Sequence, residues 1–454
     1  MTWIFAAEAL LPEGWREAVR VNIGPEGRIA AVTAGTPAVA EDYRVGLLLP
    51  ALANLHSHAF QRAMAGLTER RGQGRDSFWT WREWMYRFAG RVTPDDLQAI
   101  AAQVQVEMLE AGYAAVAEFH YLHHAPDGTD YADIAETSAR IAAAAAETGI
   151  GLTHLPVLYA HGGAGGKPLS PAQGRFGNDL SRYQRLMAGA ARALAALPGD
   201  CRLGIAPHSL RAMTPDLLAE AIAAFGQGPI HIHIAEQMQE VRDVEAWLGS
   251  RPLRWLLDHA PVDRRWCLVH ATHMTADETR DLARSGAIAG LCPITEANLG
   301  DGIFPMAEFR AAGGSYGIGS DSNVRIALAE ELRLLEYGQR LHHQARTVIC
   351  PEDSSNGETL YREALAGGHR ALGREGGALA PGLFADLVAL NTEALALDGR
   401  RGAAALDAWI FAGDDRLVRD VWSAGRHQVR DGRHPARDRV AQRFRATLRR
   451  LLAS

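Results

Sequence analysis

The fold is decided by the stretch LLLPALANLHSH, residues 47–58 of this 454-residue chain. Its apolar first half, residues 47–53, predicts a buried strand that ends where His56 and His58 begin. Side chains two residues apart on a strand point to the same face, so both imidazoles can reach one metal ion. We therefore expect the remaining ligands of a metal site to come from other strand ends.

The composition is that of a soluble globular protein, with 47% apolar and 22% charged residues. A formal net charge of −6 and the lack of a Lys/Arg stripe argue against nucleic-acid binding. The four cysteines form no CxxC pair, which predicts thiols in a reducing compartment. Because the sequence has neither a signal-peptide pattern nor a run of about 18 apolar residues, we expect a cytoplasmic protein without a membrane span.

From residue 49 onward, apolar strands alternate with helical stretches, which predicts parallel βα units. The first strand ends at His58. Seven more are expected at residues 114–121, 151–158, 202–206, 230–234, 266–270, 287–292 and 316–321. Eight such units are what a closed (β/α)₈ barrel requires. The predicted fold class is therefore α/β, with a TIM barrel over residues 49–375.

Both chain ends carry the patterns of short strands bounded by turns. These strands are expected at residues 18–23, 28–32, 378–390 and 420–426. Residues 1–48 are too few to bury a core alone, so they need a partner elsewhere in the chain. We predict a small β-sandwich built from residues 1–48 and 376–435, followed by an amphipathic helix over residues 436–454.

Polar side chains gather at the C-terminal ends of the predicted strands, where barrels carry their active sites. They are His56, His58, His208, His233, His270 and Asp321. Three imidazoles and one carboxylate suit Zn²⁺ or Fe²⁺, with an open coordination position for water. Strand parity allows either His231 or His233 as a ligand, and the HxxE spacing to Glu236 favours His233. Glu236 then stands close enough to act as an acid or base.

These motifs resemble the amidohydrolase superfamily over nearly the whole chain. The matching features are the HxH strand end, the HxxE after the fifth strand, His270, Ser320-Asp321 and the segment from Pro381-Gly382 to Val388. Binuclear members bridge two metals through a carboxylated lysine on a barrel strand, whereas the only lysine here is Lys167, in a Gly-rich loop. The resemblance implies a deaminase-like member with one divalent metal ion. Its ligands would be His56, His58, His233 and Asp321.

A closer resemblance, to the formimidoylglutamate deiminases, rests on longer stretches. They are residues 54–66, 77–82, 118–121, 208–211 and 295–302. One departure is Asn323, where a histidine is expected, but this is not a ligand position. The resemblance implies hydrolysis of N-formimino-L-glutamate to N-formyl-L-glutamate and ammonia, in histidine degradation. It also implies a homodimer.

The implied substrate carries two carboxylates and one amidine. By resemblance, Arg82 and Arg211, on loops after the first and fourth strands, hold the carboxylates, since a planar guanidinium suits that geometry. Tyr121 and Gln61 add hydrogen bonds, and His208 contacts the substrate near the metal. Which arginine takes which carboxylate stays open.

The implied chemistry assigns three further roles. A bound metal ion lowers the pKa of its water, and Asp321 accepts a proton from that water. Glu236 delivers a proton to the departing nitrogen as general acid. His270 stabilises the attacking hydroxide and the tetrahedral intermediate.

Three alternatives compete with this hypothesis. Another deaminase on the same barrel, acting on a ring amidine such as guanine or cytosine, shares every metal residue but needs no pair of arginines. The cytidine-deaminase class requires a PCxxC pair, and Cys292-Pro293 has the reverse order without a second cysteine. A barrel that serves only as a scaffold should lack ligands that this chain keeps. Zn²⁺ against Fe²⁺, and activity on formimino-aspartate, stay open.

Overall fold

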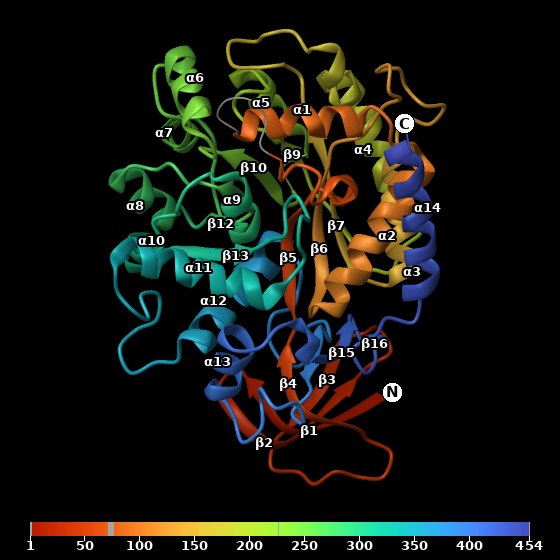
Figure 1. Cartoon of the computed structure of the whole chain (residues 1–454), viewed down its shortest axis with the longest axis vertical. Helices are drawn as coiled ribbons and strands as arrows, with labels where there is room; N and C mark the ends of the chain where they lie inside the picture. The colour runs from red at the N-terminus through yellow and green to blue at the C-terminus, as the bar shows by residue number, and fades with distance from the viewer. Residues whose placement is uncertain (1, 71–76, 226, 454) are drawn as a thin grey trace.

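A seven-stranded sheet occupies one end of the molecule in the computed structural model, which describes residues 2–70, 77–225 and 227–453 (Figure 1). Its strands are β1 (Thr2–Leu11), β2 (Gly14–Ile23), β3 (Ile29–Thr33), β4 (Tyr43–Pro50), β14 (Leu387–Leu390), β15 (Val418–Ser423) and β16 (Arg426–Val429). Their order is β16-β15-β14-β4-β1-β2-β3, with β1 and β4 parallel and the other pairs antiparallel. The two chain ends therefore share one sheet, as expected. A second sheet facing it, as in a sandwich, stays a prediction.

Parallel strands form the centre of the molecule. They are β5 (Leu52–Ser57), β6 (Tyr113–His120), β7 (Gly151–Leu158), β8 (Arg202–Leu203), β9 (Ala206–Pro207), β10 (Ile230–Ile234), β11 (Trp266–His270), β12 (Ile288–Leu291) and β13 (Ser315–Ile318). One sheet has the order β5-β6-β7-β8, with β9 on β7, and the other has the order β10-β11-β12-β13. Single bridges between Ser57 and Asp321 and between Ile205 and Ile230 join the two sheets. The α/β class with parallel strands is confirmed.

The apolar run of residues 47–53 is two strands, and the expectation of one was wrong. β4 ends at Pro50 and pairs with β1 and β14, whereas β5 starts at Leu52 and pairs with β6. Pro50 has no N–H for a ladder, and the N–H of Ala51 donates to the carbonyl of Asp386 at 2.9 Å. The run therefore carries the chain from the seven-stranded sheet directly into the parallel strands.

Three other predicted strands also differ. Residues 420–426 cover the end of β15, a turn at Ala424-Gly425 and the first residue of β16. The fourth parallel strand is split into β8 and β9 around Gly204, where a Cβ would stand 2.5 Å from the carbonyl oxygen of Pro229. Only the last part of residues 378–390 is extended, as β14. The preceding turn contains Gly382 at φ +87°, whose N–H donates to the carbonyl of Ile29 at 2.8 Å. A left-handed residue of this kind interrupts a strand.

Helices surround the parallel strands (Figure 1). They are α1 (Phe78–Ala89), α2 (Pro94–Glu110), α3 (Glu136–Thr148), α4 (Leu180–Leu194), α5 (Pro215–Phe225), α6 (Met238–Leu248), α7 (Pro252–His259), α8 (Ala276–Ser285), α9 (Pro293–Leu299), α10 (Met306–Ala311), α11 (Leu328–His343), α12 (Asn356–Ala371), α13 (Ala403–Phe411) and α14 (Arg437–Ala453). Short 3₁₀ helices lie at Ala59–Met64, Pro171–Phe176 and Asp415–Leu417. The helix expected at the C-terminus is α14. Within the described residues, no helix is both long and apolar enough to cross a membrane.

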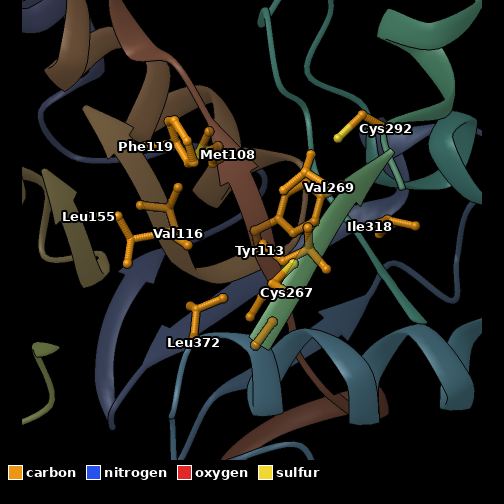
Figure 2. Close-up of a cluster of buried hydrophobic side chains, with 14 of the residues drawn as sticks. Met108, Tyr113, Val116, Phe119, Leu155, Cys267, Val269, Cys292, Ile318 and Leu372 are labelled. Carbon is orange, nitrogen blue, oxygen red and sulfur yellow. The ribbon is translucent and has the colours of Figure 1, made fainter. Parts of the chain in front are cut away.

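Apolar side chains from both parallel sheets fill the core between them. Figure 2 shows Tyr113 and Phe119 of β6 together with Cys267 and Val269 of β11 and Ile318 of β13. All five are fully buried. Removing this apolar surface from water is the main force that holds the strands together. The polar strand ends sit on top of this core.

A buried ion network ties the seven-stranded sheet to the parallel strands. The guanidinium of Arg374 donates to both oxygens of Asp386, at 2.6 and 2.8 Å, and to Asp200 at 3.0 Å. Arg426 of β16 donates to the same Asp200 at 2.8 Å. Burial alone would raise the pKa of Asp386, but Arg374 outweighs burial and lowers that pKa. Asp386 is therefore a charged carboxylate that depends on Arg374.

We expect Arg374→Met to lower the free energy of unfolding by about 3–5 kcal/mol at pH 7, because it leaves Asp386 buried and unpaired. The wild-type protein keeps the stability from this pair above the ordinary pKa of Asp, about 4, and loses it as pH falls through the lower folded pKa. The variant instead gains stability as pH falls towards 4, because its unpaired carboxyl takes up a proton. The gap in urea midpoints should therefore narrow on acidification.

The matched control is Arg416→Met, at an exposed pair with Asp414. Surface pairs contribute about 1 kcal/mol or less, so this variant should unfold near the wild-type midpoint. Equal effects of the two substitutions would contradict the role assigned to Arg374.

Candidate active site

Four side chains converge at the C-terminal ends of the parallel strands. His56 lies in β5, His58 just after it, His233 in β10, and Asp321 follows β13. The Nε2 atom of His56 is 3.1 Å from Nε2 of His58 and 3.1 Å from Nε2 of His233. Asp321 Oδ1 is 3.1 Å from His58 Nε2 and 3.5 Å from His56 Nε2. Ligands of a tetrahedral Zn²⁺ stand about 3.3 Å apart at the bond lengths such sites use.

The second ring nitrogens fix the protonation of these histidines. Nδ1 of His58 donates to the carbonyl of Phe119 at 2.9 Å, and Nδ1 of His233 donates to the carbonyl of His208 at 3.1 Å. A carbonyl only accepts, so the proton is on Nδ1 and the Nε2 lone pair points at the centre. Burial, followed by the neighbouring His58, lowers the pKa of His56 to about 3. The converging Nε2 atoms, with Nδ1 of His58 and of His233 engaged by a carbonyl, fit a bound divalent cation.

The turn that carries Asp321 is held by a buried polar network. Asp321 and Asn323 have φ angles of +45° and +54°, a left-handed conformation that asparagine tolerates well. Asn323 Nδ2 donates to Ser57 Oγ and to the Asp321 carbonyl, both at 3.1 Å, and its Oδ1 accepts from Ser320 Oγ at 2.6 Å. Gly319 lets this turn approach β5, since a Cβ there would meet the backbone nitrogen of His56 at 2.7 Å. Asparagine at position 323, where a histidine is expected, therefore fits the conformation and the hydrogen bonds of this turn.

Glu236 and His270 stand beside these four side chains. Glu236 Oε1 is 3.8 Å from His270 Nε2, and His270 Nδ1 is 3.2 Å from Glu296 Oε1. Burial raises the pKa of Glu236 to about 7, against the opposing effect of His270. Burial would lower the pKa of His270, but the carboxylates of Glu236, Glu296 and Asp321 outweigh it and raise that pKa. A carboxyl that titrates near neutrality can both give and take a proton.

A residue that sequence reasoning missed, Glu240, supports this pair from below. Its two oxygens accept the backbone N–H groups of Ala235 and Glu236, each at 3.3 Å. Ala235 has φ +49°, a strained value for alanine, so these hydrogen bonds hold the backbone that aims Glu236. The sequence offers little signal, since a glutamate in the first turn of a helix is common for the helix dipole alone.

A pocket opens above these groups, and nearly all predicted site residues line it. Its walls are His58, Gln61, Phe78, Trp81, Arg82, Met85, Tyr86, Tyr121, Tyr159, Phe176, His208, Arg211, His233, Glu236, His270, Leu299 and Asp321. His56 lies beneath the pocket, and His231, two residues before His233, points deeper, with Nε2 bonded to the carbonyl of Ala371 at 2.8 Å. The pocket therefore combines the metal-ligand group with a cationic and aromatic wall.

Arg82 lies on α1 and not on a loop, so that expectation was wrong. Figure 1 shows α1 lying across the ends of the parallel strands. Arg82 Nε donates to Tyr86 Oη at 2.7 Å, and its terminal nitrogen donates to Tyr159 Oη at 3.3 Å. Gln173 donates to the same tyrosine at 3.0 Å. Tyr159 directly follows β7, so the strand-end rule could have found it, and Tyr86 lies one helical turn from Arg82.

Arg211 is a buried cation that forms no salt bridge with a carboxylate of the described residues. Its Nε has no hydrogen-bond partner among the described residues, and its guanidinium carbon is 5.9 Å from the centre of the Trp79 ring. Burial would lower the pKa of Arg211, but Glu240 and Tyr159 raise it. A buried guanidinium in a pocket, with its Nε donor unsatisfied, favours binding of an anionic ligand.

Comparison with known proteins shows the family of the chain. A profile of the amidohydrolase family matches residues 47–427. The chain belongs to the amidohydrolase family. A profile described as the N-terminal domain of the formimidoylglutamate deiminase HutF matches residues 1–46. The formimidoylglutamate deiminase of Pseudomonas aeruginosa is 53% identical, with all of both chains aligned. The predicted resemblance to the formimidoylglutamate deiminases is confirmed.

Three further proteins resemble the chain in sequence or in fold. An 8-oxoguanine deaminase of Pseudomonas aeruginosa is 28% identical over 100% of this chain and 99% of its own. An amidohydrolase from Brucella melitensis has a crystal structure that superposes with a TM-score of 0.96 at 50% identity, covering all of both chains. An adenosine deaminase from Xanthomonas campestris with bound zinc, at 22% identity and a TM-score of 0.82, shares the fold over 100% of this chain and 99% of its own.

Proposed function

We propose that this protein hydrolyses the formimino group of N-formimino-L-glutamate, giving N-formyl-L-glutamate and ammonia, in the degradation of histidine. The observation that carries the proposal is the buried guanidinium of Arg211, whose Nε has no partner among the described residues, in a pocket that also holds His58, His233 and Asp321 of the possible His₃Asp ligand group. The full-length identity of 53% to a formimidoylglutamate deiminase supports the same reaction. A linear amidine with two carboxylates matches both features.

The substrate is held by the residues that line the pocket away from the ligand group. Arg82 and Arg211 each take one carboxylate, with Trp79 beside both guanidiniums, at 5.5 and 5.9 Å. Gln61 and Tyr121 add hydrogen bonds to the substrate. The Oε1 atom of Gln61 is available for one, because it is buried without a partner among the described residues. His208, with Nδ1 bonded to Ser209 Oγ at 2.8 Å, faces the formimino end.

The chemistry follows from the charges around the formimino carbon. His56, His58, His233 and Asp321 would hold a divalent ion, which when bound would act as a Lewis acid and lower the pKa of water towards neutrality. Asp321 accepts a proton of the attacking water. Glu236 protonates the departing nitrogen, for which its raised pKa suits it. His270, held by Glu296, faces the negative charge that develops during attack.

We expect Arg211→Met to lower kcat/KM for N-formimino-L-glutamate by about 100-fold, mostly through KM, because a buried carboxylate loses its charged partner. The control is Arg87→Met, an exposed arginine of the α1 helix, which should keep wild-type kinetics. A substrate analogue that lacks one carboxylate separates the roles of the two arginines. If Arg82→Met and Arg211→Met are both assayed with it, only the variant at the arginine that binds the missing carboxylate should have the same kcat/KM as the wild-type protein. Wild-type kcat/KM in Arg211→Met would contradict the proposed carboxylate site.

The proposed function is tested by incubating the metal-loaded protein with N-formimino-L-glutamate and identifying both products. Equal amounts of ammonia and N-formyl-L-glutamate are expected. Release of ammonia with glutamate, or of formamide with glutamate, would show cleavage of a different bond and would overturn the proposal. Formimino-aspartate, shorter by one methylene, should react more slowly because one methylene gives modest discrimination.

The proposal extends to the domains, the metal and the oligomeric state of the protein. We infer one closed eight-stranded barrel over residues 49–375, supported by the bridges Ser57–Asp321 and Ile205–Ile230 between the two parallel sheets. A β-sandwich domain of residues 1–48 and 376–435 and a helix over 436–454 complete the chain. The metal is proposed to be Zn²⁺, with Fe²⁺ as the alternative for this donor set. A cytoplasmic homodimer is proposed from the family resemblance.

A further inference from the structure

A second group of metal-binding side chains lies beside the first. Its members are His270, Cys292 and Asp321, all buried, and one ligand atom of each lies within 4.8 Å of the others. His270 ends β11, Cys292 stands between β12 and α9, and Asp321 follows β13. Three adjacent strand ends therefore supply one nitrogen, one sulfur and one oxygen donor.

The two oxygens of Asp321 face different histidines. Asp321 uses Oδ1 towards His56 and His58, whereas its Oδ2 lies 3.8 Å from His270 Nε2. The two oxygens of one carboxylate can thus serve two cations. Glu296 Oε1 accepts from His270 Nδ1 at 3.2 Å. A carboxylate on one ring nitrogen directs the other, Nε2, towards a metal.

We propose that His270, Cys292 and Asp321 form a second, inhibitory site for a thiophilic divalent cation such as Cd²⁺ or excess Zn²⁺. A thiolate and an imidazole select such ions over Mg²⁺ or Ca²⁺. Glu236 Oε1, 3.8 Å from His270 Nε2, adds negative charge at the rim. On binding, a sulfur–metal bond forms, and the Cys292 thiol proton, with any proton on His270 Nε2, leaves to solvent.

Occupation of this site blocks catalysis because the cation takes the imidazole and the carboxylate oxygen that act on the substrate. This inhibitory part rests on the proposed function, whereas binding of the cation does not. Figure 2 shows that Cys292 lies apart from Cys267, which is embedded among the apolar side chains of the core. Cys267 is equally buried and is absent from the donor group, so it offers a matched control.

The test is a titration of protein carrying one equivalent of Zn²⁺ with CdCl₂. Bound metal and the ultraviolet sulfur-to-cadmium charge-transfer band are followed together with activity. We expect one equivalent of Cd²⁺ to bind without release of Zn²⁺, the band to appear and activity to fall. Cys292→Ser and Cys292→Ala should each remove the band and raise the half-inhibitory concentration about tenfold or more. Cys267→Ser should keep the band and the wild-type half-inhibitory concentration.

Three results would overturn the second site: no band in the wild-type protein, a band that persists in both Cys292 variants, or release of one Zn²⁺ for each Cd²⁺ bound. The band also separates this inference from the proposed function. A protein that shows the cadmium band but never hydrolyses N-formimino-L-glutamate keeps the cation site and loses the proposed reaction.

Discussion

Glu236→Gln is expected to lower kcat by about 10²–10⁴-fold while the protein keeps its metal. Glutamine preserves the size of the side chain and the backbone N–H that donates to Glu240 at 3.3 Å. It cannot give a proton to the departing nitrogen. Because substrate binding depends on the arginines and not on this carboxylate, KM should change far less than kcat.

The matched control is Glu245→Gln, an exposed glutamate on α6, the helix that follows Glu236. It should leave kcat, KM and metal content unchanged. Steady-state ammonia release and metal analysis of the same samples provide the measurement. Near wild-type turnover in Glu236→Gln with metal still bound would show that another group protonates the leaving nitrogen.

His233→Ala is expected to lose the metal and, with it, at least about 4 kcal/mol of transition-state stabilisation, a loss of about 1000-fold in kcat/KM. The reason is geometric. His233 Nε2 stands 3.1 Å from His56 Nε2 at the centre of the ligand group, and its removal leaves two imidazoles and one carboxylate. Chelation of the wild-type metal should give the same loss, reversed by added Zn²⁺.

His231→Gln provides the control on the same strand. His231 is buried two residues earlier in β10 and contacts the carbonyl of Ala371, away from the ligand group. It should keep one equivalent of metal and most of its activity, even if it unfolds at lower temperature. Equal metal loss in His231→Gln and His233→Ala would contradict the assignment of His233.

Much of the parallel-strand region is predictable from short-range patterns. Strands β10 and β11 occupy the residues expected for them, because alternation and apolar runs mark buried strands directly. The same patterns locate His58, His208 and His270, because each ends or directly follows such a strand. Strand ends that meet at one edge bring His56, His233 and Asp321 together even though they are far apart in sequence.

The errors have physical causes that a local pattern does not contain. Residues 47–53 form a continuous apolar run, but Pro50 and the contact of Ala51 with Asp386 divide it between two sheets. The loop expected at Arg82 is an error of another kind, because Trp81, Met85 and Phe88 already have the spacing of one helix face. Glu240 was missed because its role depends on the left-handed backbone of Ala235, which only the folded chain reveals.

Under the proposed function, the pocket takes a linear amidine with two carboxylates. The most direct measurement is ammonia release by the metal-loaded protein from N-formimino-L-glutamate, with guanine and cytosine in parallel reactions. We predict rapid release from the formimino compound and none above background from either ring base. Turnover of a ring base without turnover of N-formimino-L-glutamate would leave the metal ligands in place and contradict the roles of Arg82 and Arg211.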